Sequence, residues 1–129
     1  MMQVLRSPLL VLLLAAALAR ADGGKTIADG VYTEEQAAAG EKLYKVQCLT
    51  CHDKRYFRPV LERWQGQSLD MIFMIMSTSM PQSNPGALPL SDYADILAYI
   101  LSQSRYPAGD SELEYQGDAL QDIRIVPRK

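Results

Sequence analysis

The sequence of 129 residues is poor in side chains that bind metals, with one histidine and two cysteines. It also lacks a surplus of positive charge, because 13 basic residues are interspersed with 15 acidic ones and the formal net charge is -2. This balance argues against nucleic acid as a partner. Internal repeats and long alternating apolar and polar runs are missing, which favours an all-α class. With 48% hydrophobic residues, the chain fits one globular domain.

The first apolar stretch has the features of a secretory signal peptide. Leu9–Ala19 is an apolar run that follows a basic amino terminus, and it ends in small residues that a signal peptidase could cleave after. Its length of about 11 residues is too short for a membrane span, which needs roughly 18. We expect residues 1–21 to be a signal peptide, residues 22–32 a flexible, glycine-rich leader, and residues 33–129 the folded domain.

The first predicted helix runs from Thr33 to about Val46. Thr33 and Gln36 fit a capping box, and two glutamates occupy the first turn, where the helix dipole favours negative charge. One apolar stripe is expected to face the core, with a neighbouring line that allows close approach of another helix. The expected stripe is Ala39, Leu43 and Val46, and the neighbouring line is Gly40 and Tyr44.

Two further helices are predicted. One begins after a Ser68 cap and continues until Pro81 stops it, and its middle is apolar on all sides. The other begins after a Ser91 cap, shows strong helical periodicity and ends near Ser104. The remaining tail holds one short candidate helix, at residues 117–123.

Both cysteines and the histidine fall within five consecutive residues, Cys48-Leu-Thr-Cys51-His52. This spacing is typical of c-type haem attachment, because two thiols on one turn of chain can each add to a vinyl group while the adjacent imidazole faces the iron. A thioredoxin-like dithiol would need a βαβ surround, and a zinc site would need further ligands. A disulfide between Cys48 and Cys51 would leave His52 without a role. The motif therefore predicts one covalently attached haem c.

Since there is no second histidine, the other axial ligand of the iron is expected to be a methionine thioether. Met80 is the best candidate, because it lies where the second predicted helix gives way to a loop. Met71, Met74 and Met76 lie within that helix, where flexible core packing is the simpler interpretation. A closed His52 and Met80 pair leaves no position for substrate, so electron transfer is expected and enzymatic activity is not. The alternative is a haem-based sensor or small-ligand binder with a displaceable Met80.

Other features accompany the haem motif: a preceding helix with Gly40 and Tyr44, a segment around Trp64, the run S79-M80-P81 and the helix S91-D-Y-A-D-I-L-A-Y-I-L. In these features, from about residue 33 to 101, the chain resembles the class I bacterial cytochromes c. The resemblance implies a small cytochrome c fold, with three main helices wrapped around the haem and Met80 as the distal ligand. It also implies that the first and last helices cross at Gly40, Tyr44 and Tyr99.

The resemblance further implies that the Pro59 carbonyl accepts a hydrogen bond from His52. The stretch from Trp64 onward and the tail R105-Y-P-A-G-D-S-E-L are similar to small cytochromes associated with bacterial quinoprotein dehydrogenases. This likeness implies a periplasmic protein that accepts electrons from a dehydrogenase and passes them to a terminal oxidase or another cytochrome. No stable membrane span is expected after signal cleavage.

Basic residues surround the haem motif, and acidic residues gather late in the chain. We expect the basic group either to steer an acidic partner toward the haem edge or to place Arg58 or Arg63 beside a haem propionate. An ordinary solvated face is an equally good interpretation. Tyr56, Phe57, Trp64 and the apolar helix are candidate walls around the haem. The basic group is Lys42, Lys45, Lys54, Arg55, Arg58 and Arg63.

Overall fold

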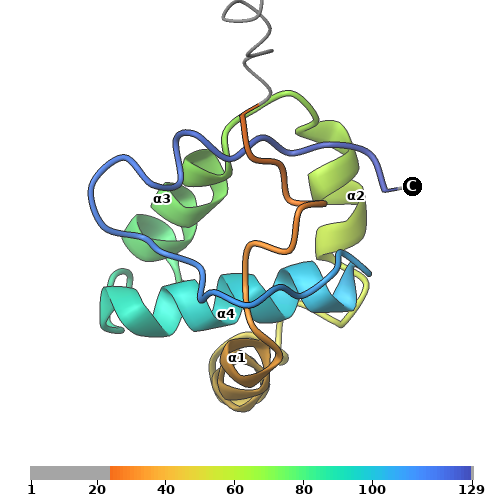
Figure 1. Ribbon diagram of the computed structural model, residues 1–129. Coiled ribbons are helices and arrows are strands. Elements are labelled where there is room, and N and C mark those ends of the chain that lie inside the picture. The colour runs from red at the N-terminus through yellow and green to blue at the C-terminus, as the bar shows by residue number, and fades with distance from the viewer. Residues whose placement is uncertain (1–23, 129) are drawn as a thin grey trace, which may run out of the picture.

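The computed structural model describes residues 24–128, so the predicted signal peptide at residues 1–21 lies outside the described residues. The helices of this part are α1 (Glu34–Gln47), α2 (Phe57–Arg63), α3 (Leu69–Ser79) and α4 (Leu90–Gln103), as Figure 1 shows. No strand occurs between residues 24 and 128, where pairing is limited to isolated bridges. The predicted all-α class is confirmed, whereas the short α2 is an element that the sequence patterns do not reveal.

Helix α1 begins after Thr33 as predicted, but only half of the predicted capping box forms, because the Gln36 side chain bonds to the backbone of Leu113 instead. The side chain of Thr33 accepts a hydrogen bond of 3.1 Å from the backbone N–H of Gln36. The predicted apolar stripe is wrong, because Val46 is 75% exposed and the buried line is Gln36, Ala37, Gly40 and Tyr44. The reason is the partner helix: α1 packs through the line that contains its one glycine, where two backbones can approach.

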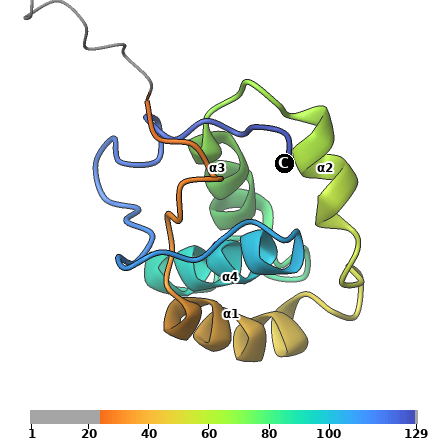
Figure 2. The ribbon, with the colours of Figure 1, turned by 45° about the vertical axis from the view of Figure 1, so that its right-hand side comes forward.

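Helices α1 and α4 cross at Gly40. A Cβ atom added there would lie 1.8 Å from the backbone oxygen of Asp95, so only glycine fits. Next to this contact the rings of Tyr44 and Tyr99 pack with their centroids 5.2 Å apart. Figures 1 and 2 both show α1 lying directly against α4. The crossing implied by the resemblance is therefore present in the structure.

Helix α4 is the most buried helix of the fold. From Tyr93 to Leu101, every residue except Asp95 is buried. The predicted Ser91 cap is wrong, because the N-cap of the helix is Pro89, two residues earlier. The carbonyl of Pro89 accepts the first helical hydrogen bond, from Asp92 N–H at 3.0 Å. A proline without an N–H costs nothing at this end of a helix.

Helix α3 follows Ser68 as predicted, although the Ser68 side chain makes no capping hydrogen bond, and it ends at Ser79 with Met80 as its C-cap. Only one face of the helix is buried, so the expectation that its methionines fill the core is wrong for two of the three. Met71 and Met74 are 37% and 48% exposed, whereas Met76 is buried. The helix lies at the edge of the fold and packs one face against α4 and the carboxyl-terminal segment. Because the helix is apolar on all sides but packs through one face only, its outer face exposes apolar side chains.

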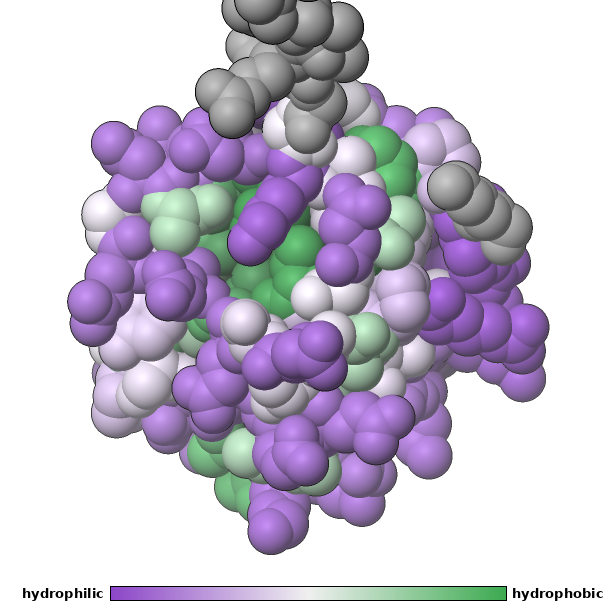
Figure 3. Space-filling view, in the orientation of Figure 1, coloured by the Kyte–Doolittle hydropathy of each residue, from purple (hydrophilic) through white to green (hydrophobic). Residues whose placement is uncertain are grey.

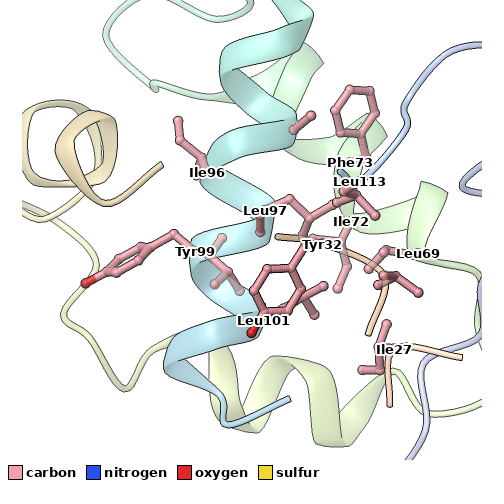
Figure 4. Close-up of a cluster of buried hydrophobic side chains, with 14 of the residues drawn as sticks. Ile27, Tyr32, Leu69, Ile72, Phe73, Ile96, Leu97, Tyr99, Leu101 and Leu113 are labelled. Carbon is pink, nitrogen blue, oxygen red and sulfur yellow. The ribbon is translucent and has the colours of Figure 1, made fainter. Parts of the chain in front are cut away.

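The segments before α1 and after α4 complete the core. Residues 24–32 are not a flexible leader in the structure, since Ile27 is fully buried and its N–H donates to the carbonyl of Arg124 at 3.0 Å. The Tyr32 hydroxyl donates to the Tyr106 carbonyl at 2.6 Å. Figure 4 shows Ile27 and Tyr32 among the buried side chains of α3 and α4. The candidate helix at residues 117–123 is a series of turns instead.

The outer surface of this core is mostly polar. In the view of Figure 3, hydrophilic residues cover most of the face, and apolar side chains show in a hollow near its centre. Within residues 24–128, no helix is both long and apolar enough to cross a membrane.

Candidate functional site

A cavity of about 650 Å³ opens between the segment after α1, the end of α3 and one side of α4. Cys48, Cys51 and His52 line it from the first segment, and Met76 and Met80 line it from the second. The structure therefore brings together every residue that the sequence predicts to hold the haem and its iron. Its volume and mostly apolar walls are typical of a cofactor pocket. The apolar wall residues include Val46, Phe57, Leu88, Ile96 and Ile100.

The haem motif forms a compact turn at the end of α1. The N–H groups of Cys51 and His52 both donate to the carbonyl of Cys48, at 3.1 and 2.8 Å. Cys48 is half-buried and Cys51 is exposed, and no disulfide joins them. Burial raises the pKa of the Cys48 thiol, so this thiol is held in its neutral form. Two unpaired thiols and one imidazole thus line the same cavity wall.

The Tyr44 side chain anchors this turn through hydrogen bonds to its backbone. Its hydroxyl donates to the carbonyl of His52 at 2.9 Å and reaches the carbonyl of Asp53 at 3.2 Å. Burial raises the pKa of Tyr44 strongly, which keeps the phenol protonated as a donor. From the sequence, Tyr44 is expected only at the helix crossing. Its second role depends on the chain turning back over α1, for which there is no local signal.

The ring of His52 lies among aromatic side chains, with its centroid 4.0 Å from that of Tyr56 and 5.8 Å from that of Phe57. Its Nδ1 atom is buried and has no hydrogen-bond partner among the described residues. The hydrogen bond expected from His52 to the Pro59 carbonyl is therefore absent here. Pro59 lies inside α2, in the first turn where proline is tolerated.

The other candidate walls divide into two groups. Phe57 lines the cavity, whereas Tyr56 and Trp64 do not. Arg58 lines a different cavity, and Arg63 is exposed on α2. The expected pairing of Arg58 or Arg63 with a haem propionate therefore finds no support in the lining of the cavity.

Met80 stands at the end of α3, where its backbone is held on both sides. Its N–H donates to the carbonyl of Met76 at 3.0 Å, and its carbonyl accepts from the Gly86 N–H at 3.2 Å. The hydroxyl of Tyr93 also donates to the Met80 carbonyl. From the sequence, Tyr93 is expected only in the apolar repeat of the last helix, and no local pattern marks this contact with Met80.

These donors match the chemistry of a covalently bound haem. Two free thiols suit attachment, an imidazole and a thioether suit axial ligation, and the apolar walls suit the faces of the macrocycle. Within residues 24–128, no group of three or more His, Cys, Asp or Glu side chains could hold a metal ion by itself. The residues present therefore fit a haem, with His52 and Met80 as the candidate iron ligands.

Comparison of the chain with known proteins found no match. The chain matches no protein-family model, no curated protein and no solved structure. An inference about function therefore starts from the residues and geometry of this cavity.

Charge around the cavity is less one-sided than the sequence suggests. Lys45 is paired with Glu41 at 2.9 Å, which neutralises one member of the predicted basic group. Lys54 and Arg55 are exposed beside the haem motif, in the segment between α1 and α2. Neither of these two side chains lines the cavity itself.

Proposed function

We propose that this protein is a monohaem c-type cytochrome that transfers single electrons between redox proteins. The observation that carries the proposal is the shared cavity of Cys48, Cys51, His52 and Met80, which come from two segments separated by α2 and α3. Residues with attachment and ligation chemistry meet in one apolar pocket, and no other local function explains all four together.

In this proposal each residue has one task. The thiols of Cys48 and Cys51 would hold the haem through thioethers, and His52 and Met80 would hold its iron. When bound, the haem supplies a one-electron redox centre whose potential is raised by the methionine ligand. Tyr44 and Tyr93 position the two ligand segments through backbone carbonyls.

The same arrangement favours an electron carrier over an enzyme or a sensor. If His52 and Met80 both held the iron, it would have no free coordination position for substrate, oxygen or a signalling gas. A sensor would require Met80 to leave, and hydrogen bonds from Tyr93 and Gly86 to the Met80 carbonyl oppose movement of that segment. Displacement of the thioether side chain alone is the remaining route, and the experiment below tests it.

We place the protein in the periplasm, with redox proteins as partners. This location rests on the predicted signal peptide at residues 1–21 and on the likeness to cytochromes associated with quinoprotein dehydrogenases. A quinoprotein dehydrogenase is the proposed donor, and a terminal oxidase or another cytochrome is the proposed acceptor. Exposed Lys54 and Arg55 would steer an acidic partner surface toward the cavity mouth.

The test is an absorption spectrum of protein from a host that attaches haem. We expect sharp α and β bands after reduction, no change under carbon monoxide, and haem that stays bound to the denatured chain. Loss of haem on denaturation would contradict attachment through Cys48 and Cys51. High-spin bands or ready carbon monoxide binding would favour the sensor.

Met80→Ala tests the distal ligand. The weak iron-sulfur charge-transfer band should disappear in this variant and persist in Met74→Ala, since Met74 is exposed and lies outside the cavity. Persistence of the band in Met80→Ala would reassign the ligand to Met76, the other methionine in the cavity wall.

A further inference from the structure

A second cavity, of about 330 Å³, lies between α2, the end of α4 and the carboxyl-terminal segment. It shares no lining residue with the proposed haem cavity. Its wall carries two guanidinium groups, from Arg58 and Arg128, and one carboxylate, from Glu62. The formal charge of the lining is therefore positive, although the whole chain is acidic.

The walls of this cavity are held by tertiary contacts. The carboxyl-terminal segment is fixed beside the end of α2, because Gly66 N–H donates to the carbonyl of Ile125 at 2.8 Å and Ile125 N–H donates to that of Gln67 at 2.9 Å. The hydroxyl of Tyr106 donates to the Val126 carbonyl at 2.7 Å. These bonds place Arg128 opposite α2 at the cavity wall.

Buried side chains form the base. Leu61, Ser104 and Tyr106 are 1%, 5% and 7% exposed, and all three line the cavity. Such a base excludes water from one side of any group bound there, and a charge-assisted hydrogen bond gains strength where water is excluded. The cavity is thus a recess built by three separate parts of the chain.

One nitrogen of the Arg58 guanidinium group has no hydrogen-bond acceptor. Its Nε atom is buried and has no hydrogen-bond partner among residues 24–128. Glu62 lies four positions later on α2, a spacing that often gives an ion pair, yet the described residues contain only the Lys45–Glu41 pair. A buried donor without an acceptor is costly, so such an atom in a native protein is normally paired with a protein group, an ordered water or an ion.

We propose that this cavity is a binding site for a small oxyanion of the phosphate or sulfate class, held between the guanidinium groups of Arg58 and Arg128. The planar fork of arginine matches tetrahedral oxyanions through paired N–H···O bonds. The anion would meet the two guanidinium groups from the cavity side, and it would tie α2 to the carboxyl-terminal segment. A haem propionate is the less suitable occupant, because the site lies outside the lining of the haem cavity.

The test uses the haem-loaded full-length protein and inorganic phosphate as the probe. Phosphate is titrated against sodium chloride of equal ionic strength, while the Arg Nε–H and backbone amide signals are followed by nuclear magnetic resonance. We expect saturable shifts of the Arg58 Nε–H and Ser104 signals with phosphate only. Arg58→Gln and Arg128→Gln should each weaken binding about tenfold or more, since each removes charge-assisted hydrogen bonds.

Two further variants test whether binding depends on the cavity lining or on overall charge. Arg63→Gln removes the same charge from an exposed position on the same helix, outside the cavity, and should leave the affinity unchanged. Glu62→Gln removes the one carboxylate of the lining and should tighten binding.

Three outcomes would overturn the proposal. The first is a phosphate response that does not saturate or that chloride reproduces. The second is an equal loss of affinity in Arg63→Gln and Arg58→Gln, which would indicate general charge attraction. The third is an Arg58→Gln variant that leaves phosphate binding unchanged but shifts the reduction potential, which would assign Arg58 to a propionate.

Discussion

Replacement of Gly40 by alanine probes the close contact between α1 and α4. The added Cβ would lie 1.8 Å from the Asp95 oxygen, 2.3 Å from the Asp95 carbonyl carbon and 2.9 Å from the Ile96 nitrogen. All three atoms belong to the backbone of α4 and cannot rotate away. Since ordinary carbon to oxygen contacts begin near 3.3 Å, the two helices would have to separate by roughly 1.5 Å.

The expected loss of stability follows from two opposing effects. Overpacking of this kind costs about 3 kcal/mol when the neighbours cannot yield, and alanine regains about 1 kcal/mol through its higher helix propensity. We therefore expect Gly40→Ala to lower the free energy of unfolding by about 2 kcal/mol. For a domain of this size the midpoint of thermal unfolding should fall by about 10 °C.

The assay is thermal unfolding of the haem-loaded protein, followed by circular dichroism. Gly24→Ala is the matched control, because its Cβ would lie 3.4 Å from the nearest atom, the Asp122 oxygen, in ordinary contact. Ala38→Gly, at an exposed position of α1, measures the propensity difference alone and should cost about 1 kcal/mol. A Gly40→Ala protein at least as stable as the wild type would refute the close helix crossing.

Three further perturbations follow from the structure. Tyr44→Phe removes the hydroxyl that lies 2.9 and 3.2 Å from the carbonyl oxygens of His52 and Asp53. It should lower the free energy of unfolding, measured with denaturant, by about 1 to 2 kcal/mol. An equal loss in Tyr56→Phe, whose ring is exposed, would contradict this role. Burial raises the pKa of Asp95, so the folded state favours its protonated form and stability is lost as pH rises through that pKa. Asp95→Asn should therefore unfold at a higher temperature than the wild type at pH 7, but not at about pH 3; equal differences at both pH values would exclude this cause. Reversing the charges of Lys54 and Arg55 to glutamate should slow electron transfer to an acidic partner and reverse its salt dependence, whereas an unchanged salt dependence would end the steering hypothesis.

Local patterns predicted the parts of this fold that local forces decide. The Thr33 cap is correct, because capping acts within a few residues. Helix α3 also starts after Ser68 as predicted, but without a capping hydrogen bond from that side chain. The start of α4 was misplaced, since Pro89 serves as its N-cap and Ser91 competes with it two residues later. The short α2 has too little periodicity to be recognised.

Burial was predicted less well, because it depends on which neighbours a helix meets. Val46 looks like a core residue by spacing, yet it faces the haem cavity and is exposed in the protein chain alone. Met71 and Met74 look buried by composition, yet α3 lies at the edge of the fold. Glycines suggested a flexible segment before α1, but Ile27 of that segment enters the core.

Residue types alone set the chemistry of the proposed site, since five consecutive residues carry both thiols and the only imidazole, and they point to Met80 by elimination. That Met80 shares a cavity with that motif follows only from the fold, because α3 and the motif meet through α4 rather than through neighbouring sequence. It also decided which tyrosines hold the two ligand segments and that Arg58 faces a separate recess. Residue type sets what a side chain can do, whereas the packing of distant segments sets what it can reach.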